Sequence, residues 1–224
     1  MTSAPATTPT DAAPGPGLTR LDLPDGVSTP RAVVLVLHGG TQVSTAPVAG
    51  RSASWRRAAA LQRAVTPALH DQGVATWLLR YRVRGWNGGG DSVPDARWAL
   101  GQVREAHGEV PVVLLGHSMG ARTAVHVADA PHVAGVVGLA PWWDPASDPV
   151  RTLAGRHLRA AHGRTDKITS ARMTRRYVAA AEPVADSAAF TDMGRVGHYL
   201  LRRVERWNAY ARDSVLEVLE AARV

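Results

Sequence analysis

The sequence predicts an α/β protein with a mostly parallel central sheet and helices on both faces, in three layers. Two observations support this fold class. From residue 31 to residue 224, short apolar runs alternate with longer segments that are compatible with helices, and this alternation is typical of parallel sheets. The short runs are apolar throughout rather than at every second position, as expected for strands that are buried on both faces.

The expected strands and helices follow one another along the chain. The strands are 31–37, 74–79, 112–115, 133–139, 157–161 and 188–191. The helices are 53–71, one that opens at Pro94 and Asp95, 121–130, a short one that starts at Asp148, 168–181, and a terminal helix after residue 200. The terminal helix carries apolar residues at spacings of three and four, which is the pattern of one buried face.

The chain divides into a tail and a single domain. Residues 1–29 are rich in Pro, Thr, Ala, Gly and Asp, and they offer too little apolar surface to offset the cost of ordering. We therefore expect a disordered N-terminal tail, although residues 18–23 alternate weakly and would suit an edge strand. Residues 30–224 are expected to form one domain, since this length suits one domain better than two.

Composition excludes several classes of protein. The chain has no cysteine, which rules out disulfides and thiolate metal sites. The net charge is +7 and Lys167 is the only lysine; because the arginines are dispersed rather than gathered in one block, we expect no nucleic-acid partner. No apolar run approaches a membrane span or the core of a signal peptide, so we expect no membrane partner and a cytoplasmic location.

One stretch carries the chemistry. Gly116-His117-Ser118-Met119-Gly120 fits G-x-S-x-G and lies between an expected strand and an expected helix, which is the context of a nucleophile on a sharp, strained turn. The two glycines leave room for the strand and the helix to approach closely. The Met119 N–H at the start of the helix is then placed to stabilise an oxyanion. The alternative is that Ser118 is only a helix cap.

A serine nucleophile needs a base and an orienting carboxylate, and both should follow strands at the same edge of the sheet. His198 follows the last expected strand and is our candidate base. Asp166 follows the strand before it and is the favoured acid, with Asp144 as the alternative. The other histidines fit less well: His132 and His157 lie before or at the start of strands, at the opposite edge. His162 lies at the correct edge but adjoins Asp166, and is interpreted as a turn residue or one that supports the site. His117 is interpreted as a packing or pocket residue.

The loops at this edge supply further candidates. His38-Gly39-Gly40 follows the first central strand, so we expect the Gly40 N–H as the second oxyanion donor, with Thr41 beside it in the substrate site. Residues 141–156 are too few for a separate cap, which predicts an open site lined by Trp86, Trp142 and Trp143; ordinary packing is the alternative for these tryptophans.

Taken together, these motifs resemble the α/β-hydrolase superfamily, and the likeness covers roughly residues 31–224. The chain looks most similar to small cap-less serine esterases and dienelactone-hydrolase-like members. The resemblance implies an α/β-hydrolase catalytic domain over 30–224, with Ser118 as nucleophile, Asp166 as acid, His198 as base, and Gly40 and Met119 as the oxyanion hole. The chain departs from the family pattern in its glycine-rich loop after Arg84 and in lacking a proline soon after Asp166.

The predicted activity is hydrolysis of a carboxylic ester or thioester through an acyl-enzyme, with a small-molecule acyl ester as the substrate. Acyl transfer or peptide cleavage on the same triad is one alternative, and a catalytically silent fold that acts as a binding module is another. Motifs for nucleotide and zinc binding are absent from the sequence, so we expect no cofactor and no metal.

Overall fold

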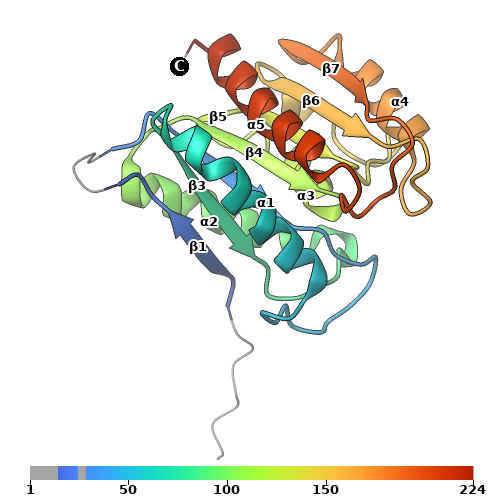
Figure 1. The fold of residues 1–224 in the computed structure, drawn as a ribbon, viewed down its shortest axis with the longest axis horizontal. Helices are drawn as coiled ribbons and strands as arrows, with labels where there is room; N and C mark the ends of the chain where they lie inside the picture. The colour runs from blue at the N-terminus through green and yellow to red at the C-terminus, as the bar shows by residue number, and fades with distance from the viewer. Residues whose placement is uncertain (1–14, 25–28, 224) are drawn as a thin grey trace, which may run out of the picture.

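The computed structural model describes residues 15–24 and 29–223, and in it seven strands form one twisted sheet (Figure 1). The strand order is β1-β3-β2-β4-β5-β6-β7. All neighbours pair in parallel except β1, which runs antiparallel to β3. The strands are β1 (Gly17–Leu21), β2 (Ala32–Leu37), β3 (Val74–Arg80), β4 (Val112–His117), β5 (Val133–Leu139), β6 (His157–His162) and β7 (Ser187–Asp192).

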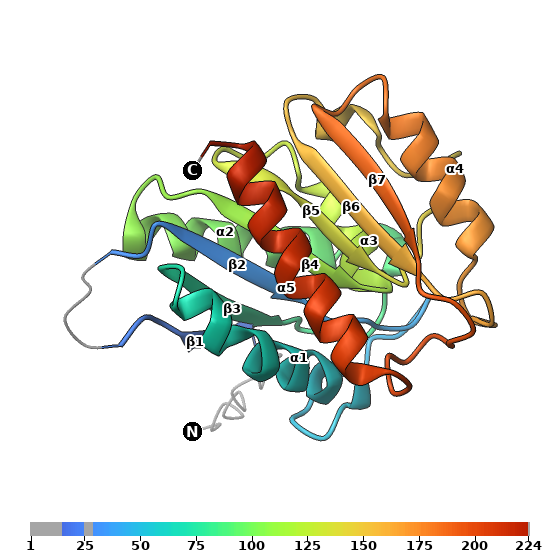
Figure 2. The same cartoon turned by 45° about the horizontal axis from the view of Figure 1, so that its top comes forward.

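Helices cover both faces of the sheet and bury two apolar cores. The first core, on one face, takes side chains from α2, α3 and α4, and the second, on the other face, takes them from α1 and α5, which lie together in front of the sheet in Figure 2. The predicted three-layer α/β class is therefore confirmed. The helices are α1 (Ala53–His70), α2 (Ser92–His107), α3 (Met119–His126), α4 (Ala171–Ala181) and α5 (Val204–Ala221), with 3-10 turns η1 (Asn87–Gly89) and η2 (Arg151–Leu153).

Most elements begin and end within a few residues of the predicted bounds, and two differ. Helix α3 ends at His126 rather than at residue 130, because the chain turns there to enter β5. The short helix expected from Asp148 is the single turn η2. Each helix that the structure describes is too short or too polar to cross a membrane.

The register of the parallel strands aligns their carboxyl ends at one edge. Leu37 of β2 pairs with Gly116 of β4, and His117 pairs with Leu139 of β5. Farther along the sheet, His162 of β6 pairs with Asp192 of β7. The loops that leave these strands therefore start side by side. They carry every candidate site residue except Trp86, which lies in the loop after β3.

The predicted disordered tail is wrong for Gly17–Leu21, which form β1 at the edge of the sheet; the edge-strand alternative for residues 18–23 is confirmed for its first four residues. Side chains of α1 and β3 hold this strand and the residue after it: Gln62 Nε2 donates to the Thr19 carbonyl at 3.1 Å and Trp77 Nε1 donates to Asp22 at 2.7 Å. Long-range pairing thus orders a segment whose own apolar content is low. Residues 1–14 and 25–28 of the predicted tail lie outside the described residues.

Removal of residues 1–22 should therefore lower the melting temperature. The truncation exposes the buried edge of β3 and removes the β1 ladder, whose hydrogen bonds contribute about 1 kcal/mol each. At 2–4 °C per kcal/mol for a domain of this size, we expect a loss of roughly 5–10 °C by calorimetry. Removal of residues 1–14 alone leaves β1 in place and is the control. Equal melting temperatures for the two truncations would contradict the role of β1.

Candidate active site

Ser118 sits on a sharp turn between β4 and α3, with φ 55° and ψ −117°. A positive φ is strained for a serine and persists only where the surroundings enforce it. The surroundings here are two close backbone approaches: a Cβ on Gly116 would overlap the backbone of Ala121, and a Cβ on Gly120 would overlap the carbonyl of Leu37. The prediction that both glycines are needed for close approach is confirmed.

Three side chains at this edge form one hydrogen-bonded chain. His198, in the loop after β7, places Nε2 3.0 Å from Ser118 Oγ. Its other nitrogen, Nδ1, lies 2.8 Å from Oδ2 of Asp166, in the loop after β6. Because an ionised carboxylate only accepts, Nδ1 carries the proton and Nε2 is left to accept the hydroxyl proton of Ser118. The structure thus brings together the serine, histidine and aspartate that the sequence singled out.

The alternative acid, Asp144, is placed differently. Its carboxylate accepts from the Ala146 N–H at 3.0 Å and from the Ser147 hydroxyl at 3.0 Å. These bonds close a turn after β5. Among the described residues, no histidine contacts Asp144, so the geometry favours Asp166 as the partner of His198.

Asp166 is held by more partners than its histidine. Oδ1 accepts the backbone N–H groups of Ile168 and Thr169 at 2.8 and 2.9 Å, and Oδ2 accepts His162 Nε2 at 3.0 Å. Burial by itself would raise the pKa of this carboxyl, but the hydrogen bonds from the two histidines and the two backbone groups outweigh it and hold the pKa well below its usual range. Asp166 is therefore an anion at any pH near neutrality.

Two further groups support this carboxylate: Thr169, which the sequence analysis missed, and His162, which it interpreted as a turn residue or a residue that supports the site. Thr169 places its hydroxyl 3.0 Å from Asp166 Oδ2 and 3.1 Å from His198 Nδ1. His162, fully buried, donates to Asp166 and lies 2.8 Å from Thr174 of α4 through Nδ1. The only signal for Thr169 was its closeness to Asp166 in the sequence, and proximity along the chain does not specify a side-chain direction.

The loop after β2 brings Gly39 and Gly40 against the turn that carries Ser118. A Cβ on Gly39 would lie 3.4 Å from the Cβ of Ser118, and one on Gly40 would overlap Met119 Sδ. His38 Nδ1 donates to the Gly39 carbonyl at 2.6 Å, while its Nε2 accepts from the Tyr81 N–H at 3.3 Å. The Gly39 carbonyl and the Gly40 N–H belong to one planar peptide group, so His38 also fixes the direction of that N–H.

Two histidines at this edge are kept neutral by burial. Burial lowers the pKa of His38 to about 4, even though its bond to Gly39 favours the charged form. Burial likewise lowers the pKa of His117 to about 3, and the repulsion that a protonated His117 would feel from a protonated His198 adds to the effect. His117 Nε2 donates to the His198 carbonyl at 3.0 Å. His117 therefore anchors the loop that carries the candidate base. This is a more specific role than the predicted one of a packing or pocket residue.

A cavity of about 200 Å³ opens beside Ser118. Its walls come from the loop after β2, the turn at β4, the start of α1 and the loop after β7. The lining residues are Gly39, Gly40, Ala53, Ser54, Arg57, His117, Ser118, His198, Tyr199 and Leu201. Tyr199 and Leu201 are 60% and 70% exposed, so they form an apolar rim at the mouth of the cavity.

The predicted substrate residues Trp86, Trp142, Trp143 and Thr41 do not line this cavity. Trp143 is buried beneath β5, where its Nε1 donates to the Ala121 carbonyl at 2.8 Å. The Arg122 guanidinium lies over the rings of both Trp86 and Trp142, at 4.9 and 4.6 Å from their centres. The packing alternative is therefore correct for the tryptophans. Thr41 is exposed, and its backbone pairs with Arg84 and Trp86.

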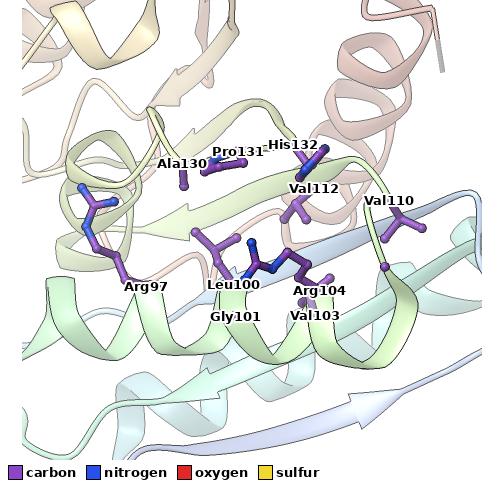
Figure 3. A pocket seen from close by; sticks show the side chains of 11 residues that line it. Arg97, Leu100, Gly101, Val103, Arg104, Val110, Val112, Ala130, Pro131 and His132 are labelled. Atoms are coloured by element: carbon purple, nitrogen blue, oxygen red, sulfur yellow. The ribbon is translucent and has the colours of Figure 1, made fainter.

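A second cavity, of about 210 Å³, lies at the opposite edge of the sheet. Figure 3 shows its side chains, which come from α2 and from the segments that enter β4 and β5. His132 lies there, as its position before a strand predicted, and pairs loosely with Glu109 at 3.7 Å. Ser118, Asp166 and His198 follow the carboxyl ends of their strands, whereas this cavity lies at the amino ends of β4 and β5. Elsewhere in the described part of the chain, no group of three or more His, Asp or Glu side chains is arranged to hold a metal ion.

Comparison with solved structures shows the fold. The chain is similar to an α/β serine hydrolase without lid from Xanthomonas campestris, with 19% identity, a TM-score of 0.64, and 91% of this chain and 94% of that chain covered. It is similar to the esterase Est2 of Thermogutta terrifontis with propionate bound, at 17% identity, TM-score 0.70, and 91% and 88% coverage. Est1E of Butyrivibrio proteoclasticus, bound to ferulic acid, aligns at 12% identity, TM-score 0.66, and 92% and 96% coverage.

The comparison with protein families is more specific. No curated protein matches the sequence. The model of the family described as serine aminopeptidase, S33, matches residues 79–219, which is more than half of the chain and spans Ser118, Asp166 and His198. The chain therefore belongs to the serine aminopeptidase S33 family, a family of serine hydrolases within the α/β-hydrolase superfamily.

Proposed function

We propose that this serine hydrolase cleaves carboxylic esters or thioesters through an acyl-enzyme, with Ser118 as nucleophile, His198 as base and Asp166 as the orienting acid. The observation that carries the proposal is the hydrogen-bonded chain Ser118–His198–Asp166, with distances of 3.0 and 2.8 Å. A nucleophile, a base and an orienting carboxylate are the parts that acyl transfer requires. The esterases among the similar structures support an ester as the bond that is cleaved.

Acylation begins when Ser118 Oγ attacks the acyl carbon and His198 Nε2 takes its proton. The carbonyl oxygen becomes an oxyanion, which the N–H groups of Gly40 and Met119 stabilise. Among the described residues, neither N–H donates to a backbone carbonyl, so both are available. His198 then gives its proton to the leaving oxygen or sulfur, the bond to the acyl carbon breaks, and the acyl group stays on Ser118.

Deacylation repeats these steps with water. His198 takes a proton from the water as its oxygen attacks the acyl carbon, and the released Ser118 oxygen receives that proton when the acid leaves. Asp166 remains an anion throughout, because its hydrogen bonds keep its pKa below the usual range despite its burial. Its charge stabilises the imidazolium and holds the tautomer that exposes Nε2 to Ser118.

Peptide cleavage is the second candidate, because the family description names an aminopeptidase. An aminopeptidase must bind the protonated amine at the end of its substrate, and a carboxylate suits that charge best. The described residues that line the cavity at Ser118 include Arg57 and no Asp or Glu. The charge of the cavity thus favours an ester without a free amine. A comparison of p-nitrophenyl acetate with alanine p-nitroanilide discriminates the two bonds.

Two further alternatives are acyl transfer and a silent binding module. Acyl transfer would use the same acyl-enzyme, with an alcohol in place of water. A silent binding module would form no acyl-enzyme, and the intact hydrogen bonding of Ser118 and His198 weighs against it.

Replacement of the nucleophile tests the proposal directly. Ser118→Ala should abolish labelling by a fluorophosphonate probe and lower ester turnover by several orders of magnitude, while the melting temperature stays close to that of the wild type. Ser54→Ala changes a second serine of the same cavity and should still be labelled. Labelling of the Ser118→Ala protein at the wild-type rate would refute the assignment.

The two aspartates give a second test. Asp166→Asn should lower kcat about 10⁴-fold, because an asparagine favours the wrong histidine tautomer. Asp144→Asn should cost far less, since Asp144 closes a turn and contacts no described histidine. Steady-state kinetics with p-nitrophenyl acetate would measure both, and the reverse ranking would make Asp144 the acid.

The size of the cavity predicts the acyl preference. In a cavity of about 200 Å³ with an exposed apolar rim, each methylene of the acyl chain adds ~0.8 kcal/mol of binding free energy. This gain ends once the apolar surface of the cavity is covered. For p-nitrophenyl esters, kcat/KM should peak at acyl chains of about two to six carbons. Trp143→Ala should not move this peak but should destabilise the fold by about 3–5 kcal/mol, because Trp143 lies in the core. Activity that rises steadily through long acyl chains would show that a mobile segment covers the site.

A further inference from the structure

Arg57 of α1 brings a positive charge to the cavity at Ser118 without a negative partner. Its Nη2 donates to the Leu200 carbonyl at 3.1 Å. Its Nε is buried and has no hydrogen-bond partner among the described residues. No described Asp or Glu pairs with it, whereas arginines such as Arg82, Arg122 and Arg159 each have a carboxylate within 4 Å. Arg57 is thus half-buried and has no carboxylate partner among the described residues.

The charge of Arg57 is present at any working pH and acts on the catalytic edge. Burial lowers the pKa of its guanidinium, but the ordinary value is so high that the group stays a cation. The same charge is one of the causes that lower the pKa of His117, the neighbour of Ser118. An unpaired cation that is partly removed from water is costly, and an anionic group in the cavity would supply the missing partner.

A second, more open cavity of about 520 Å³ extends this positive surface. It shares Ala53, Arg57 and Leu201 with the cavity at Ser118. Its lining adds three further arginines and no described carboxylate; these are Arg51, Arg56 and Arg63. Charges of one sign that line a cavity focus the field and raise the local concentration of anions. Four of the arginines that appear dispersed in the sequence therefore lie together along α1 and just before it, beside the cavity at Ser118.

We propose that the Ser118 site acts on esters or thioesters that carry a negative charge, a carboxylate or a phosphate, and that Arg57 is the residue that binds this charge. The proposal rests on the hydrolase function proposed above and names its substrate class. Arg57 makes the contact nearest the reacting bond, and Arg51, Arg56 and Arg63 attract a more distant or second charge. Tyr199 and Leu201, exposed at the rim, contact the uncharged part of the substrate.

A purely structural role for Arg57 makes a different prediction. Leu200 has a positive φ of 55°, and the bond from Arg57 to its carbonyl ties the loop after His198 to α1. That bond uses one of the five N–H donors of the guanidinium. A structural clamp would affect neutral and anionic substrates equally, so the ratio between the two substrates separates binding of a charge from support of the loop.

The first experiment uses two matched substrate pairs. Mono-p-nitrophenyl succinate and its methyl-capped ester differ in one carboxylate on the acyl side. Acetyl-coenzyme A and S-acetyl-N-acetylcysteamine differ in the phosphates of the leaving group. The wild type should prefer the anionic member of at least one pair, and Arg57→Gln should lower that preference, as a ratio of kcat/KM, about 10- to 100-fold. The pair that responds identifies a carboxylate or a phosphate as the recognised anion.

Two further variants keep the test independent of folding. Arg57→Lys retains a positive charge and should restore part of the preference, while Arg104→Gln removes the same charge from the cavity at the opposite edge of the sheet (Figure 3) and should leave the ratio unchanged. A melting temperature for each variant shows that the fold is intact. An equal fall for neutral and anionic substrates in Arg57→Gln would assign it the clamp role and overturn the proposal.

A binding measurement distinguishes the proposed anion site from the proposed hydrolase function. Calorimetry of the Ser118→Ala protein with coenzyme A and with succinate reports the anion site without turnover. The anion site is supported if one of the two probes binds and Arg57→Gln weakens that binding at least tenfold while Arg104→Gln does not. This outcome supports the anion site even if no ester is hydrolysed. Efficient hydrolysis of neutral esters, with no anion preference and no binding of either probe, would overturn the anion site and leave the hydrolase function standing.

Discussion

The close approach of α3 to β2 and β4 is the constraint on which the rest of the site depends. Gly120 lies against the Leu37 carbonyl and Gly116 against the backbone of Ala121, with no room for a side chain at either position. This contact forces Ser118 into a positive φ and lifts its hydroxyl to the edge of the sheet. It also brings Met119 against Gly40, so one packing contact positions the candidate nucleophile together with both candidate oxyanion donors. A larger residue at Gly116 or Gly120 would displace all of them at once.

Four histidines lie at this edge, and their environments give them different tasks. His38 fixes the peptide before Gly40, His117 anchors the loop of His198, and His162 donates to Asp166. Burial keeps His38 and His117 neutral, with pKa values lowered to about 4 and about 3. A neutral imidazole can hold one backbone carbonyl firmly without placing a positive charge beside the candidate base, His198. His198 is the histidine that contacts both Ser118 and Asp166, and its neighbours act through it.

The sequence predicted the layers and the chain order of the site well, because both depend on local patterns. Apolar runs revealed the strands, and residues that follow parallel strands must meet at one edge, which is why the sequence placed Ser118, Asp166 and His198 together, as the structure does. Side-chain direction was not predictable in the same way. Trp143 follows β5 closely, yet its indole turns under the sheet to contact Gly138 and Tyr177. Strand β1 depends on pairing with β3 and on Gln62 and Trp77, none of which is visible in residues 17–21 themselves.

The charge of Arg57 matters more because the site around Ser118 has no cap in the described part of the chain. Residues 141–156 contain only the turn η2 between β5 and β6, so no described element closes over Ser118 to exclude water. Apolar contacts then contribute little, because the cavity is small and its rim residues Tyr199 and Leu201 are exposed. A fixed charge acts over several ångströms and needs no closed lid, although salt screens it beyond about 8 Å at physiological ionic strength. Selection among esters would therefore depend more on the charge that they carry than on the fit of their acyl chains.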